Sequence, residues 1–265
     1  MRTGVVQFEP EFGNIKRNMD RVLSMVSGED ADLFVLPELV LSGYIFESRD
    51  EAVSLSQDPT GDEFAGVAAL AAEKEATIVL GFAERAGDRL FNSSILVAPD
   101  GKRFVYRKIQ LFNDEKTVFD PGDRAPDVVE VNGVRLGMMI CFDWIFPEVA
   151  RTLALKGADV LCHATNLVLP FCQDAMVTRC IENRVFAVTS NRVGTEARAG
   201  SELTFTGRSQ VVAPKGEILT RADVEGEGVF VVEIDHTLAR DKSVTPRNDI
   251  LEDRRTEFYE LGPGQ

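Results

Sequence analysis

Residues 137–148 read GMMICFDWIFPE, and they bring together a strand, a cysteine and the start of a helix. The apolar run from Gly137 to Ile140 is typical of a buried strand. Pro147 favours the first turn of a helix, because the N–H that proline lacks is not needed there. Sites in α/β proteins lie where strands end and helices begin. The stretch therefore predicts an α/β fold with Cys141 at a candidate site.

The same alternation of strands and helices continues along the chain. Strands are predicted at 3–8, 31–36, 77–81, 134–141, 158–161 and 185–190, helices at 14–27, 60–74, 147–157 and 174–184, and hairpin turns at 99–101 and 214–216. Asn14 can cap the first of these helices, and Thr60 to Glu63 have the spacing of a capping box that opens the second. The order of elements repeats, which indicates two similar halves. Two mixed sheets, each covered by helices on one face, would pack against each other as a four-layer αββα sandwich.

Length and charge narrow the classes of protein. The 265 residues predict one domain over 1–265, with a polar tail at 241–265 that packs on a neighbouring subunit or on the parent domain. With 43 acidic against 29 basic residues the net charge is -14, which argues against nucleic acid and anionic membranes as partners. No apolar run approaches a membrane span, and the first ten residues are too short for a signal peptide's apolar region. We expect a cytoplasmic protein.

Cysteine and histidine usage excludes several mechanisms. The cysteines Cys141, Cys162, Cys172 and Cys180 lack CxxC spacing, and we expect reduced thiols. Only two histidines occur, and no HExxH motif or Cys/His cluster has metal-ligand spacing, so we expect no metal. Phosphate-cradling glycine loops of the GxxxxGK[ST] and GxGxxG types are also missing.

Cys141 is the candidate nucleophile, and Glu38 and Lys108 are its candidate partners. Glu38 follows the apolar run 33–36, where an unpaired carboxylate would be costly and a raised pKa would make it a base. Lys108 ends a predicted strand, where its ammonium could lower the pKa of the thiol and hold an oxyanion. The alternatives are a structural buried cysteine, a solvated Glu38 and an edge-strand lysine.

Other residues complete or compete with this set. Glu115 could orient Lys108 or act as a second acid; the alternative is a solvated loop glutamate. A thiol hydrolase of the Cys-His type would have to use His163 or His236. His163 is one residue from Cys162 in a strand and so points to the opposite face, and His236 lies in an acidic turn.

Taken together, the motifs around Glu38 (LPEL), Lys108 (YRKIQLF) and Cys141 (CFDWIFPE) resemble the nitrilase superfamily of carbon-nitrogen hydrolases. The similarity covers nearly the whole chain and points to the short archaeal nitrilase-like and bacterial amidase branch. Gln110 departs from the frequent Lys-x-His-Leu pattern, which affects the pocket lining rather than the mechanism.

The resemblance implies an αββα sandwich without cofactor or metal, associating as a homodimer or a larger homo-oligomer. It implies Cys141 as nucleophile, Glu38 as general base, Lys108 as oxyanion stabiliser helped by the backbone N–H of Phe142, and Glu115 as an additional carboxylate. We also expect four residues that follow strand ends to line the pocket: Tyr44, Trp144, Asn166 and Phe171.

The predicted activity is hydrolysis of a small or aliphatic amide to a carboxylic acid and ammonia. A nitrilase and an N-carbamoyl-amine hydrolase would use the same residues, so the motifs leave these alternatives open. A non-enzymatic interaction module on the same scaffold is the remaining alternative, and the joint presence of Glu38, Lys108 and Cys141 weighs against it.

Overall fold

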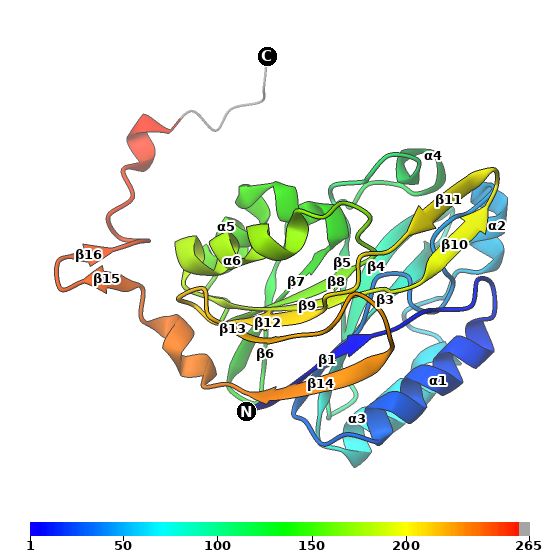
Figure 1. Ribbon diagram of the computed structural model, residues 1–265, viewed down its shortest axis with the longest axis horizontal. Coiled ribbons are helices and arrows are strands. Elements are labelled where there is room, and N and C mark those ends of the chain that lie inside the picture. The colour runs from blue at the N-terminus through cyan, green and yellow to red at the C-terminus, as the bar shows by residue number, and fades with distance from the viewer. Residues whose placement is uncertain (260–265) are drawn as a thin grey trace.

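The computed structural model describes residues 1–259, and its centre is a pair of six-stranded mixed sheets (Figure 1). The first sheet has the order β14-β1-β2-β3-β4-β5. Its strands are β1 (Arg2–Gln7), β2 (Leu33–Val35), β3 (Thr77–Ala86), β4 (Arg89–Val97), β5 (Arg103–Arg107) and β14 (Gly228–Glu233). The parallel strands β1, β2 and β3 form its middle, and the outer strands pair antiparallel.

The second sheet repeats this plan with the order β13-β12-β9-β8-β7-β6. Its strands are β6 (Val128–Val131), β7 (Val134–Ile140), β8 (Val160–Thr165), β9 (Phe186–Asn191), β12 (Gln210–Val212) and β13 (Ile218–Arg221). Strands β7, β8 and β9 are parallel, and an antiparallel hairpin follows in each half. The predicted α/β sandwich with similar halves is confirmed.

Helices cover the outer faces of both sheets. The first sheet carries α1 (Ile15–Ser27) and α3 (Ala65–Glu73), and the second carries α5 (Pro147–Leu155) and α6 (Cys172–Asn183) (Figure 1). The short helices α2 (Arg49–Ser54) and α4 (Glu115–Val118) and the ladder of β10 (Thr195–Arg198) with β11 (Ser201–Thr204) gather at one end of the molecule. Helices in residues 1–259 fall short of the length and hydrophobicity needed to cross a bilayer.

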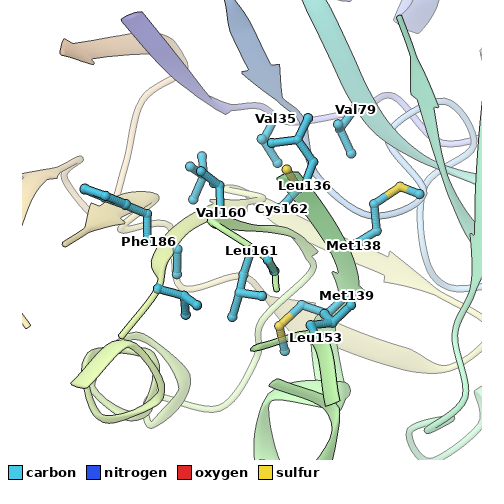
Figure 2. Packing of buried hydrophobic residues seen from close by; sticks show 14 of the residues in the cluster. Val35, Val79, Leu136, Met138, Met139, Leu153, Val160, Leu161, Cys162 and Phe186 are labelled. Atoms are coloured by element: carbon cyan, nitrogen blue, oxygen red, sulfur yellow. The ribbon is translucent and has the colours of Figure 1, made fainter. Parts of the chain in front are cut away.

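The core between the sheets follows the alternation of side chains along each strand. Figure 2 shows Val35 and Val79 of the first sheet close to Leu136 and Cys162 of the second. Met139, the next residue after Met138, lies on the opposite side of β7 near Leu153 of α5. Gly137 permits this contact, since a Cβ there would lie 2.9 Å from a Leu153 methyl. The apolar run that opens the nucleophile stretch is therefore buried on both faces.

Most predicted elements form within a few residues of their expected bounds, but one predicted helix N-terminus was wrong. Asn14 caps α1 by accepting from the Arg17 N–H, as predicted. Thr60 does not cap a helix: its hydroxyl bonds Asp58, a 3-10 turn (η1, Asp62–Phe64) follows, and α3 begins only at Ala65. Strand β3 runs five residues beyond the predicted Gly81, because it pairs with β4 as a long hairpin.

The C-terminal segment leaves the body of the molecule beyond β14 (Figure 1). It forms η3 (His236–Arg240), a ladder of β15 (Ser243–Thr245) with β16 (Asn248–Asp249), and η4 (Thr256–Phe258). Arg240 ties its start to buried Asp159, and the Lys242 ammonium binds the carbonyls of Asn183 and Arg184. The part of the predicted tail at 260–265 lies outside the described residues.

Candidate active site

The structure brings Glu38, Lys108, Glu115 and Cys141 together at one end of the parallel strands. The Lys108 ammonium donates to Glu38 Oε1 and to Glu115 Oε1, at 2.7 Å each. Glu38 and Lys108 are fully buried, and Glu115 and Cys141 are 6 % exposed. The charges of the other three act on the Cys141 thiol. Residues as far apart in the chain as Glu38 and Cys141 thus form one buried cluster.

Glu38 is held in a tight turn directly after β2. The turn hydrogen bonds to β3 through Gly81, whose N–H donates to the Pro37 carbonyl and whose carbonyl accepts from the Val40 N–H. A Cβ on residue 81 would lie 2.5 Å from Glu38 Cα, so only glycine allows this approach. The sheet therefore fixes the position of the Glu38 backbone, from which the carboxylate extends.

Lys108 follows β5 immediately, and backbone bonds hold it on both sides. Its N–H donates to the Asn92 carbonyl, and its own carbonyl accepts from the Gly122 N–H. The Asn92 side chain also donates to Glu38 Oε1 at 2.7 Å. Asn92 thus supports both members of the pair, a contact that the sequence analysis did not identify.

Cys141 stands at the end of β7 in a conformation that L-residues rarely adopt. Its φ is +39°, and it opens the 3-10 segment η2 (Cys141–Ile145). Such backbone strain persists only where the surroundings enforce it, and it is concentrated at functional sites. Here the ring of buried His163 lies 3.0 Å from the Cys141 carbonyl oxygen.

The resting thiol is neutral. Burial raises the pKa of Cys141 well above its ordinary value, the charge of Glu38 raises it further, and Lys108 only partly offsets this. The expected pKa-lowering effect of Lys108 is therefore real but does not prevail. A thiol in this state needs a base in contact with it to become a nucleophile.

Glu38 and Lys108 have the protonation properties that such a site needs. Burial raises the pKa of Glu38 against the opposing effect of the Lys108 charge, which makes it a stronger base than a solvated glutamate. Burial alone would lower the pKa of Lys108, but the charges of Glu115 and Glu38 outweigh it and raise that pKa. The lysine therefore stays an ammonium.

Three buried acceptors in and around the site have no hydrogen-bond partner among the described residues. They are Glu38 Oε2, Asn166 Oδ1 and Asn92 Oδ1, and Asn166 also lines the cavity beside the sulfur. The Asn166 amide already donates to the Glu38 carbonyl, which aims its oxygen elsewhere. A buried acceptor without a donor is costly, and at a functional site it indicates a missing ligand group.

Glu115 and Tyr44 lie behind the ammonium. The Tyr44 hydroxyl donates to Glu115 Oε1 at 2.7 Å, and the Phe112 N–H donates to Glu115 Oε2 at 3.2 Å. The Glu196 carboxylate accepts from the backbone N–H groups of Tyr44 and Ile45. Tyr44 thus supports the acidic partner of Lys108 and is not part of the cavity wall described next.

A small cavity of about 20 Å³ lies beside the sulfur, which is room for about one water molecule. Its lining is mostly apolar: Phe112, Cys141, Phe142, Trp144, Asn166, Leu167, Val168 and Leu169. Trp144 and Asn166 are where the sequence placed them. Phe171 is not: it precedes α6, is 62 % exposed and does not line the cavity. The loop 167–169 takes its place, because the chain turns away before α6 begins.

The histidines are not placed to act as the base. His163 contacts the Cys141 carbonyl rather than the sulfur, and burial lowers its pKa to about 4. His236 lies 3.6 Å from Asp159, which precedes β8, whereas the site follows it. The six residues of β8 separate the two ends by about 20 Å. Within the described part of the chain, no group of His, Cys, Asp and Glu is arranged to hold a metal ion.

Comparisons with known proteins place these observations in a family. The carbon-nitrogen hydrolase family profile matches residues 2–242. A nitrilase of Pyrococcus abyssi is 43 % identical over 263 residues, which cover 98 % of this chain and 99 % of the relative. An (R)-stereoselective amidase of a Pseudomonas species is 35 % identical, covering 96 % of this chain and 92 % of the relative.

Solved structures give the same result. A mutant amidase of the nitrilase superfamily from Nesterenkonia AN1 matches with a TM-score of 0.82 and 26 % identity, covering 97 % of this chain and 95 % of that one. A second mutant structure of the amidase from Nesterenkonia sp. AN1 has a TM-score of 0.81 and 25 % identity, covering 97 % of each chain. In that protein acrylamide has undergone Michael addition at the active site cysteine.

Proposed function

This chain belongs to the carbon-nitrogen hydrolase family, and from that premise we propose that it is an amidase that converts small neutral amides to carboxylic acids and ammonia. It is a thiol-dependent hydrolase of carbon–nitrogen bonds. The observation that carries the proposal is the buried cluster in which a carboxylate with a free oxygen, an ammonium and a thiol meet beside one small cavity.

In the first half of the reaction, Glu38 takes the proton of the Cys141 thiol through its unpartnered Oε2. The sulfur attacks the amide carbon, and the carbonyl oxygen becomes an oxyanion. As the carbon–nitrogen bond breaks, Glu38 returns the proton to the departing nitrogen, so that ammonia leaves and a thioester on Cys141 stays behind. The raised pKa of Glu38 suits both transfers, because a group that must accept and return a proton works best near neutrality.

The second half repeats the proton transfers with water. Glu38 removes a proton from water, the hydroxide attacks the thioester carbon, and the carbon–sulfur bond breaks. The proton then goes to the departing sulfur, which restores the neutral thiol and releases the carboxylic acid. The buried surroundings favour the neutral thiol, which makes it a ready product of this step.

Lys108 and the Phe142 N–H are the proposed stabilisers of the oxyanion. Lys108 remains charged because two carboxylates face it. Phe142 is the second residue of η2, a position whose N–H has no acceptor within a 3-10 turn. Donors held in place before the reaction are worth more in a dry site than in water.

The unpartnered acceptors favour an amide over a nitrile. An amide carries two N–H donors, and Glu38 Oε2 and Asn166 Oδ1 are buried acceptors without a donor. A nitrile carries no N–H and would leave Asn166 Oδ1 without a donor. A site built to accept hydrogen bonds rejects substrates that lack the donor strongly.

The lining favours an uncharged acyl group. The cavity lining contains no charged side chain among the described residues, and its walls are aromatic and aliphatic. Many carbamoyl compounds carry a carboxylate or an ammonium, whose charge would be buried here without a partner.

A substrate panel tests the proposal. We expect ammonia release from acetamide, propionamide and isobutyramide, and rates at least about 100-fold lower for the matched nitriles, because the nitriles cannot donate to Asn166 Oδ1. The measurement is initial ammonia release at equal substrate concentrations, with the boiled protein as blank. Faster hydrolysis of the nitriles, or of N-carbamoyl compounds, would overturn the amidase assignment and favour those activities.

We also propose that the chain forms a homodimer or a larger homo-oligomer. Apolar side chains are exposed on the helices beside the nucleophile turn, namely Leu155 on α5 and Ile181 on α6, at 46 % and 48 %. Exposed apolar side chains on these two helices support association between copies of the chain.

A further inference from the structure

Asp143 joins the two parts of the site that bear Lys108 and Cys141. It lies two residues after Cys141 and is fully buried. Its Oδ2 accepts from the Tyr106 hydroxyl at 2.8 Å and from the Ile140 N–H at 2.9 Å. Its Oδ1 accepts from the Gln110 N–H at 3.2 Å. One carboxylate therefore binds three donors from two separate segments of the chain.

The positions of these donors are informative. Tyr106 and Gln110 stand two residues before and two residues after Lys108, and Ile140 directly precedes Cys141. The carboxylate thus bonds the segment of the lysine on both sides and the segment of the cysteine at the start of its strained turn. The two segments belong to different sheets, because β5 ends the first and β7 lies in the second.

We propose that Asp143 is a positioning residue that sets the placement of the Cys141 sulfur relative to Lys108. This inference rests on the proposed roles of those two residues. The positive φ of Cys141 is an unfavourable conformation that the surroundings must maintain. Asp143 accepts from the N–H of Ile140, which precedes Cys141, and the ring of His163 lies 3.0 Å from the Cys141 carbonyl oxygen.

The competing explanation is a purely structural buried carboxylate, and Asp159 offers the matched control. Asp159 is also fully buried and accepts from Arg135 and Arg240. It precedes β8, at the end of the sheet away from the site. If Asp143 were only structural, Asp143→Asn and Asp159→Asn would both lower stability and leave the reactivity of each folded molecule unchanged.

The experiment compares Asp143→Asn, Tyr106→Phe, the double variant and Asp159→Asn in the full chain. For each folded protein we measure kcat and KM on the best amide of the panel, and the rate of Cys141 alkylation by iodoacetamide. A displaced reacting group costs about 100-fold, so Asp143→Asn is expected to lower kcat by about that factor and to slow alkylation, with KM within about threefold.

Tyr106→Phe removes one donor and keeps the carboxylate, so we expect a loss in kcat of about tenfold. The double variant should match Asp143→Asn alone, since Tyr106 acts through Asp143. Asp159→Asn should keep the kcat and the alkylation rate of the wild type.

Several results would overturn the inference. A wild-type kcat and alkylation rate in Asp143→Asn would contradict it. So would a double variant whose loss in kcat is the product of the losses in Asp143→Asn and Tyr106→Phe. If Asp143→Asn does not fold, Tyr106→Phe decides alone, and an unchanged kcat there refutes the inference. If the wild type hydrolyses no amide and iodoacetamide does not favour Cys141, the proposed function fails first, and the role of Asp143 with it.

Discussion

Replacing Cys141 with alanine is expected to abolish amide hydrolysis while the protein keeps its fold. The thioester cannot form without the sulfur, and removal of a catalytic nucleophile costs at least about 10⁴-fold in kcat. Alanine keeps a Cβ of the same size at the strained position, so the turn is not relieved. The measurement is single-turnover and steady-state ammonia release, with circular dichroism to verify folding.

Cys162→Ala is the matched control. Cys162 lies in β8 between the sheets, is fully buried and has a pKa that burial raises to about 12, so it is an inert thiol. We expect a loss of stability of about 1 kcal/mol, typical of core truncation, and an unchanged kcat. Activity that is retained in Cys141→Ala and lost in Cys162→Ala would show that Cys141 is not the nucleophile.

Replacing Lys108 with methionine is expected to reduce both activity and stability. Methionine has a similar length but no charge, so the oxyanion loses a donor, which costs about 10²–10³-fold in kcat. Glu38 and Glu115 lose the ammonium that both contact at 2.7 Å. Removal of one partner from a buried charge pair costs about 3–5 kcal/mol.

Chemical denaturation and kcat measured on the same Lys108→Met preparation test both effects. The control is Lys102→Met, which removes a solvent-exposed pair with Asp100 and should change neither stability nor kcat measurably. A Lys108→Met protein with wild-type stability would mean that the buried charge cluster is not formed as described. Wild-type kcat would mean that the lysine does not stabilise the oxyanion.

The sequence predicts the fold well where the hydrophobic pattern is periodic and where the residues that start or end an element act locally. Asn14 and Pro147 start α1 and α5 as predicted, because each signal acts within a few residues. The Thr60 signal failed because a competing side-chain bond to Asp58 satisfies the hydroxyl instead. The predicted length of β3 was also too short, since the strand is extended by pairing with β4 in a long hairpin rather than by a local pattern.

For the site, the motifs identified the charged residues and the cysteine, but not the residues that hold them in position. Glu38, Lys108 and Cys141 stand in recognisable runs, and the structure brings them together. Gly81, Asn92 and Asp143 act through contacts with residues far away in the chain, which no local pattern reveals. Phe171 was misplaced because the direction of the loop 167–171 depends on packing.

Trapping the acyl group on Cys141 is the most direct test of the central claim that one buried acid, one ammonium and one thiol form a single catalytic site. Acid quenching of the wild type during turnover of propionamide protonates Glu38 and stops it from activating water, so a thioester present at that moment is preserved. Peptide mass spectrometry after incubation with propionamide should then show a propionyl adduct on the peptide that contains Cys141. An adduct on Cys162, Cys172 or Cys180 instead, or undiminished turnover by Glu38→Gln, would contradict the account.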